Sequence, residues 1–172
     1  MDRKKGDVKL TCEGKDVFCH KFLLISGSPV FRAMFDMDSK ENRENVVAIE
    51  DCNQGTLEAF VTYLYDARMS KYYSPEDLEL VFGLLYMANK YQVHELLLGC
   101  MDTLLNIMNT DNVLKILAVV VKLELGDEIK DELTNFMKEN IVVVTDSEEW
   151  APFLSDYPSL MKDFVIKFVK EK

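Results

Sequence analysis

The chain has 172 residues, 48% of them apolar and 29% charged, which are the proportions of an ordinary globular protein. Its 30 acidic and 20 basic residues are interleaved and give a formal net charge of −10, which argues against nucleic acid and anionic membranes as partners because both need concentrated positive charge. No apolar run is as long as a membrane span and the first residues lack the apolar core of a signal peptide, so we expect an intracellular protein of the nucleus or cytoplasm.

The first predicted elements are strands. Residues 7–12 alternate polar and apolar side chains, residues 13–15 supply a turn that contains a glycine, and residues 16–20 return. This pattern is typical of a β-hairpin. One more short strand is predicted over residues 46–49, after a polar loop over residues 36–45.

Two helices are predicted between these strands. Residues 22–25 are nearly all apolar, so the first helix should be buried on every side. Ser28 and Pro29 are typical of an N-cap and a first helical position, and the second helix should continue through Phe35 with its apolar residues on one face.

Amphipathic helices are predicted for the rest of the chain. They are expected from Asn53 or Thr56 to residue 64, from Ser74-Pro75 to residue 85, over 97–108, over 113–120 with Asp111 as a cap, over 129–137, from Ser147 for a short distance, and over 160–168. The predicted fold class is therefore α+β: short strands capped by a helical cluster, followed by α-helical hairpins.

One candidate catalytic pair is His20 with Ser26 or Ser28. A serine nucleophile needs a base within hydrogen-bonding reach and a third group that orients this base. Ser28 is better explained as a helix cap, and the I-S-G-S-P sequence lacks the G-x-S-x-G frame of a hydrolase. We therefore interpret His20 as a structural residue and keep a hydrolase only as a third hypothesis.

No pattern predicts a metal, a cofactor or an enzyme. His94 and Glu95 supply two ligands where zinc needs three or four, and the glycines never cluster into a phosphate loop. The acidic pairs lie at predicted helix N-termini, where the helix dipole explains them. The cysteines lack zinc-site spacing and are expected to be reduced, mostly buried thiols; they are Cys12, Cys19, Cys52 and Cys100.

The remaining candidates for function are surface residues. The polar loop over residues 36–42 follows a well-defined helix. A group of tyrosines is a second candidate, because a tyrosine can bury its apolar ring at an interface while its hydroxyl stays in contact with water. Ordinary half-buried surface tyrosines explain the group equally well. The group comprises Tyr63, Tyr65, Tyr72 and Tyr73.

Three stretches of the chain together resemble a BTB/POZ domain. They are DVKLTCEGKDVFCHKFLLISGSPVFRAMF, VVAIEDCNQGTLEAFVTYLYDARM and LLYMANKYQVHELLLGC. The resemblance covers residues 7–107, residues 108–172 resemble a 3-box with part of a BACK extension, and the likeness is nearest to MATH-BTB proteins of the speckle-type POZ group. Such relatives are substrate adaptors of cullin-3 ubiquitin ligases. The resemblance implies a non-enzymatic adaptor that forms a homodimer, docks the cullin-3 N-terminal domain and holds a substrate protein through a domain not found in this sequence.

The resemblance also indicates which residues would contact the cullin. The family uses a φ-x-E motif after the second helix, where φ is an apolar residue that fills a pocket on the cullin. The aligned residues are Ser39, Lys40 and Glu41, so the glutamate matches and the apolar anchor does not. The lost burial is worth about 1–3 kcal/mol, and Met37 would replace it only if the loop shifted. Ser39 therefore supports an alternative, a structural module for homodimerisation or protein interaction without cullin binding.

A homodimer is the second implied property. Leu23 matches an interface position of the family, and Phe22 and Leu24 beside it are expected to share the interface. The leucine-rich segment that precedes the hairpin in these relatives is not found before Asp7, so we expect a weaker dimer. Corepressor-binding members pair this aspartate with a basic residue after the first helix, and Gly27 in the basic position disfavours a repressor-type role.

Overall fold

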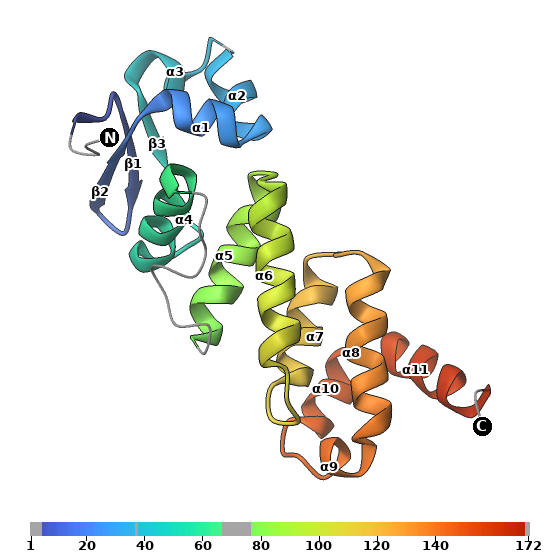
Figure 1. Ribbon diagram of the computed structural model, residues 1–172. Helices are drawn as coiled ribbons and strands as arrows, with labels where there is room; N and C mark the ends of the chain where they lie inside the picture. The colour runs from blue at the N-terminus through green and yellow to red at the C-terminus, as the bar shows by residue number, and fades with distance from the viewer. Residues whose placement is uncertain (1–4, 37, 67–76, 171–172) are drawn as a thin grey trace. The chain divides into compact units, whose positions relative to one another are not determined.

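A computed structural model of the chain describes residues 5–36, 38–66 and 77–170, without the side chains of residues 163 and 167–170 (Figure 1). The described residues form three strands and eleven helices, which confirms the predicted α+β class. They divide into two compact units, Met1–Thr103 and Leu104–Lys172. None of the helices in the described part of the chain is long and apolar enough to cross a membrane.

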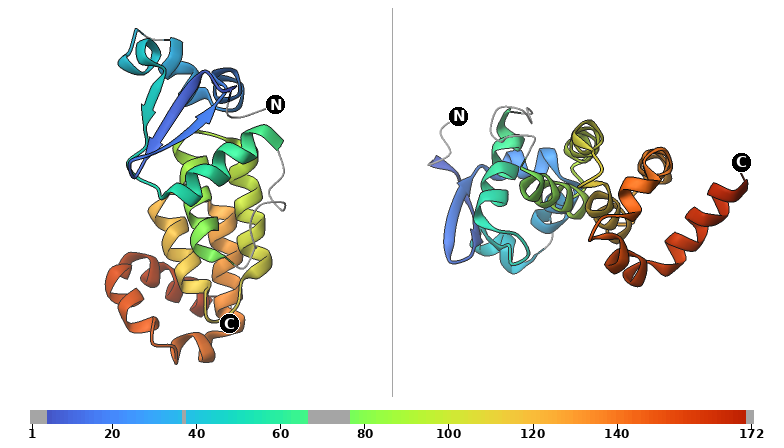
Figure 2. Two further views of the ribbon diagram at one scale, coloured as in Figure 1. Left: turned by 90° about the vertical axis from the view of Figure 1, so that its left-hand side faces the viewer. Right: turned by 90° about the horizontal axis from the view of Figure 1, so that it is seen from below.

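The strands of the first unit form one small sheet with the order β2-β1-β3 (Figure 2). Leu10 in β1 lies opposite Val17 of antiparallel β2 and opposite Val47 of parallel β3, and all three side chains are buried. Glu13 and Gly14 close the hairpin with φ angles of 50° and 75°, so the predicted hairpin and the third strand are confirmed. The bounds are β1 (Val8–Cys12), β2 (Lys15–Cys19) and β3 (Val46–Ala48).

Helices α1 to α6 complete the first unit, with α6 continuing past its boundary. The predicted helix start at Ser74-Pro75 lies outside the described residues, and α5 is capped by Asp77, whose carboxylate accepts from the backbone N–H of Leu80 at 3.1 Å. Asn53 rather than Thr56 caps α4, because its side chain accepts from the Thr56 N–H. The bounds are α1 (Lys21–Gly27), α2 (Pro29–Asp36), α3 (Lys40–Glu44), α4 (Gln54–Asp66), α5 (Leu78–Lys90) and α6 (His94–Ile107).

Tyr91 is the residue where α2, α4 and the turn between α5 and α6 meet. Its ring lies parallel to the ring of Phe31, with centroids 4.4 Å apart, and 5.8 Å from the ring of Phe60. Its carbonyl accepts a hydrogen bond from the Ser28 hydroxyl at 2.6 Å, and the same hydroxyl oxygen accepts from the Phe31 N–H at 3.1 Å. Ser28 therefore caps α2 as predicted and also joins this helix to the end of α5 through Tyr91.

The second unit consists of helices alone after the end of α6. Here α7 packs against both α8 and α10, and α10 packs against α11, so the prediction of helical hairpins is confirmed. The prediction of Asp111 as a cap is wrong: the side chain of Asn109 accepts from the N–H groups of Asp111 and Asn112 instead. The bounds are α7 (Val113–Lys122), α8 (Asp127–Glu139), α9 (Ile141–Thr145), α10 (Trp150–Asp156) and α11 (Pro158–Lys170).

Replacing Ser28 tests the junction at Tyr91. Ser28→Ala removes the cap of α2 and leaves the buried Tyr91 carbonyl without the hydroxyl partner, so unfolding by urea should require about 2–3 kcal/mol less free energy. Ser26→Ala, at an exposed position on α1, is the matched control and should change stability by less than about 0.5 kcal/mol. Equal stability of the two variants would contradict this role for Ser28.

Candidate functional site

His20 is held by Tyr65 and not by a serine. The His20 N–H donates to the Tyr65 hydroxyl at 3.0 Å, and His20 Nδ1 lies 2.5 Å from the same oxygen. The hydroxyl of Ser28 is committed to the Tyr91 carbonyl, and Ser26 is exposed. The structure therefore does not bring the candidate catalytic residues together as base and nucleophile, and it accounts for His20 as a structural residue.

The helix α1 leaves part of its apolar surface uncovered. Leu24 is fully buried, Leu23 is half-buried and Phe22 is 69% exposed, so the prediction that this helix is buried on every side is wrong. The reason is that α1 packs against α2 and α4, and a helix covered by two neighbours keeps an outer face. Leu24 is used within the core of the first unit, so only Phe22 and Leu23 of this group are open to a contact with another molecule. Phe18 on β2 is a further exposed aromatic residue, at 46%.

Asp7 and Lys21 connect the start of α1 to neighbouring segments. The Asp7 carboxylate accepts from the Lys21 N–H at 2.7 Å, and the Lys21 ammonium donates to the side-chain oxygen of Asn42 at 2.7 Å. A Cβ atom at Gly27 would lie 2.7 Å from Leu64 Cδ2, so this position takes no larger residue unless Leu64 moves. Asp7 thus binds the first residue of α1 within the chain, and Gly27 allows close contact between α1 and α4.

Ser39 begins the short helix α3, within the stretch that the sequence predicted as loop. Its Oγ accepts from the backbone N–H three residues later at 3.1 Å and donates to the Met34 carbonyl at 3.0 Å. Lys40 is exposed and Glu41 is half-buried in the first turn, where the helix dipole stabilises a carboxylate. Met37 lies outside the described residues. A serine followed by a first-turn glutamate is itself a helix-start signal, so the sequence contained the information that the loop prediction missed.

Asp51 anchors a charged cluster that sequence reasoning did not find. Its carboxylate accepts from the Lys90 ammonium at 2.5 Å and from the Tyr86 hydroxyl. Burial alone would raise the pKa of Asp51, but the hydrogen bonds from Lys90 and Tyr86 outweigh it and hold the pKa below its usual value. The cluster ties the segment before α4 to α5, and both charged side chains are partly exposed. We interpret it as a structural ion pair.

The four cysteines form no disulfide with one another, and burial suppresses the thiolate form of two of them. Cys12, Cys19 and Cys100 are buried and Cys52 is half-buried, while the Cys12 thiol donates to the Cys52 carbonyl at 2.8 Å. Burial raises the pKa of Cys52 to about 12 and that of Cys100 to about 12, so the thiolate form is disfavoured in both. No group of three or more His, Cys, Asp or Glu residues in the described part of the chain is placed to hold a metal ion.

The sequence is similar to known proteins over most of its length. Residues 2–108 match the BTB/POZ domain family. The chain is 25% identical over 157 residues to the TD and POZ domain-containing protein 4 of Mus musculus, covering 91% of this chain and 41% of that protein. It is 28% identical over 153 residues to a BTB/POZ domain-containing protein of Arabidopsis thaliana, covering 89% of this chain and 60% of that protein. The chain thus spans less than two thirds of the length of each of these relatives.

The cap at Ser39 can be tested by exchanging the residue. Ser39→Ala removes the side-chain oxygen that caps α3, so α3 should become less stable by about 1 kcal/mol and its amide hydrogens should exchange about fivefold faster. Ser39→Asp keeps an oxygen acceptor at the cap and should exchange at the wild-type rate. Unchanged exchange in the alanine variant would show that the cap does not hold this helix.

Proposed function

This chain belongs to the BTB/POZ family of protein-interaction domains, and on that premise we propose that it is a non-enzymatic adaptor of a cullin-3 ubiquitin ligase. It forms a homodimer through α1, docks the N-terminal domain of cullin-3 near α3, and links a substrate protein to ubiquitination. Residues 108–172 act as the 3-box and part of a BACK extension, and the substrate is held by a further domain. The observation that supports this proposal most is the family match over residues 2–108 together with the uncovered face of α1.

The exposed ring of Phe22 supports self-association through α1. A phenylalanine side chain gains about 2–3 kcal/mol when it is fully removed from water, and a two-fold symmetric contact buries the same residue on both protomers. Leu23 lies beside it and is only half-buried by its own protomer. The two residues therefore provide an apolar contact, while Leu24 fixes the helix that carries them.

Glu41 and Lys40 support a polar contact with cullin-3 near α3. Glu41 occupies the position of the family's acidic residue and is partly open to solvent, and Lys40 is exposed beside it. Ser39 stands where the resemblance expects an apolar anchor for cullin. Its hydroxyl instead caps α3 through hydrogen bonds within the chain. We therefore propose a cullin contact that is weaker than one with an apolar anchor at this position.

The absence of enzymatic activity is part of the same proposal. His20 and Ser28 each have a structural partner, and burial raises the pKa of the Cys52 and Cys100 thiols. The described side chains therefore supply no activated nucleophile of the kinds considered from the sequence.

A second candidate function is a homodimerisation or protein-interaction module that does not bind cullin. Ser39 favours it, because residues 39–41 contain no apolar side chain and the Ser39 hydroxyl is already bonded within the chain. The two candidates share the α1 dimer and differ only in the contact near α3.

The dimer contact is tested by Phe22→Asp. A charge at this exposed position cannot be buried against a second protomer without a large desolvation cost, so the wild-type dimer should become a monomer at micromolar concentration in sedimentation equilibrium. Phe18→Asp, which also replaces an exposed aromatic residue but lies on β2, should leave the dimer intact. A dimer that survives Phe22→Asp would place the interface elsewhere.

The cullin contact is tested by Ser39→Met in calorimetry with the cullin-3 N-terminal domain. The methionine supplies the missing apolar anchor, worth about 1–3 kcal/mol, but loses the cap of α3, worth about 1 kcal/mol, so affinity should rise by up to about thirtyfold. Ser39→Ala loses the same cap without adding an anchor and should bind more weakly than Ser39→Met. Absence of heat with all three proteins would favour the second candidate function.

A further inference from the structure

Lys21 joins the helix of the proposed dimer contact to the helix of the proposed cullin contact. It is the first residue of α1, directly before Phe22, and its own N–H donates to the Asp7 carboxylate at 2.7 Å. Its ammonium donates to the side-chain oxygen of Asn42 in α3 at 2.7 Å. It also donates to the side-chain oxygen of Asn45, the residue that follows α3, at 3.2 Å. One side chain of α1 therefore reaches the middle and the end of α3.

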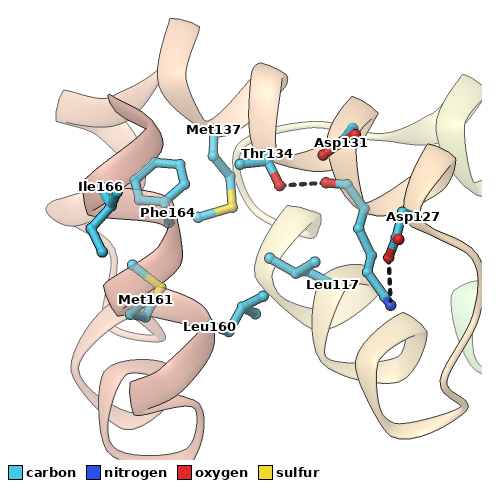
Figure 3. A pocket seen from close by; sticks show the side chains of 10 residues that line it. Leu117, Asp127, Asp131, Thr134, Met137, Leu160, Met161, Phe164 and Ile166 are labelled. Carbon is cyan, nitrogen blue, oxygen red and sulfur yellow. Dashed lines mark hydrogen bonds and ion pairs between the residues drawn. The ribbon is translucent and has the colours of Figure 1, made fainter. Parts of the chain in front are cut away.

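An aromatic ring of α2 holds the same ammonium. Lys21 Nζ lies 4.6 Å from the centroid of the ring of Phe35, which is buried near the end of α2, and a ring face attracts a cation at this distance. Lys130 of the second unit differs, because it pairs with Asp127 at 3.3 Å within the single helix α8 (dashed line at Asp127 in Figure 3). Such a pair links no two elements, whereas the ammonium of Lys21 links α1, α2 and α3.

α3 is the element of this group that depends most on its neighbours. It has five residues, Lys40–Glu44, and none of them is buried. A helix this short is unstable by itself in water. It is held by the Ser39 cap, by the hydrogen bond from Lys21 to Asn42 and by packing against α2 and β3. α3 therefore has a folded and a frayed state, and Lys21 stabilises the folded one.

We propose that Lys21 couples self-association through α1 to the order of α3, so that the dimer presents a better-formed cullin contact than the monomer. This coupling rests on the proposed function, because it uses both of its surfaces. Packing of Phe22 against a second protomer orders the first turn of α1 and with it the backbone of Lys21. Less conformational freedom is then lost when the ammonium binds Asn42, so α3 becomes more ordered.

The coupling acts in both directions. Dimerisation favours folded α3 by some factor, and any partner that requires folded α3 tightens the dimer by the same factor. A cullin bound at Lys40 and Glu41 therefore strengthens the contact at α1. Lys21 is a positioning residue in this scheme, since it acts on the cullin contact through Asn42 and does not need to touch the cullin itself.

Amide hydrogen exchange of α3 tests the coupling without any cullin. The α3 peptide, which contains the Arg43 N–H bonded to the Ser39 carbonyl, is followed by mass spectrometry below and above the concentration at which sedimentation shows the dimer. Lys21→Met removes the ammonium and keeps the length of the side chain, and Lys21→Arg keeps the charge and the donors. Asn42→Ala removes the acceptor instead, and Lys15→Met is the matched control at an exposed residue of β2.

In the wild type, α3 should exchange about fivefold more slowly in the dimer than in the monomer. Lys21→Met and Asn42→Ala should each bring this ratio to about one, while Lys21→Arg and Lys15→Met should keep it. If Lys21 only supports the fold, Lys21→Met speeds exchange equally in both states and leaves the ratio unchanged. That result, or a wild-type ratio of about one, would overturn the coupling and leave the dimer itself intact. Absence of a dimer at every concentration would contradict the proposed function and the coupling together.

Discussion

The first unit depends on the packing of Tyr91 against Phe31 and on the hydrogen bond between its carbonyl and Ser28. These contacts join residues far apart in the sequence, since Ser28 and Tyr91 are separated by 63 positions. The hydroxyl of Ser28 satisfies two backbone groups at once in a buried place, where an unpaired carbonyl would be costly. The ring of Phe60 extends the same cluster to α4. The positions of α1 and α3, which flank α2, follow from this fixed centre.

The surfaces proposed for partners lie on elements that this centre holds in place. α1 is fixed by buried Leu24 and by close contact between Gly27 and Leu64, and it leaves Phe22 outside. α3 is fixed by the cap at Ser39, and it presents Lys40 and Glu41 on its first turn. In α1, buried Leu24 holds the helix and neighbouring Phe22 is exposed. In α3, the hydrogen bonds of Ser39 hold the helix and neighbouring Lys40 is exposed. Such a division of roles is suited to contacts with other proteins.

The sequence was informative where local chemistry decides the structure. The hairpin, the Ser28-Pro29 helix start and the amphipathic helices follow from turn residues, caps and periodicity, and they are present in the described residues, although the cap predicted at Asp111 was wrong. It was less informative where tertiary partners decide. The apolar residues of α1 were predicted to be buried, but only contacts with α2 and α4 determine that Leu24 is covered and Phe22 is not. For α7, α8 and α11 the periodicity predicted which face of each helix is apolar, but it did not predict which neighbour covers that face.

The most direct test of the adaptor proposal is the native mass of the protein alone and mixed with the cullin-3 N-terminal domain. The account predicts a species of twice the protomer mass of 19.9 kDa, and in the mixture a species heavier by one cullin fragment per protomer. A single measurement thus reports the homodimer and the partner together. A monomer that stays unchanged in mass when the cullin fragment is added in excess would contradict the proposal on both counts.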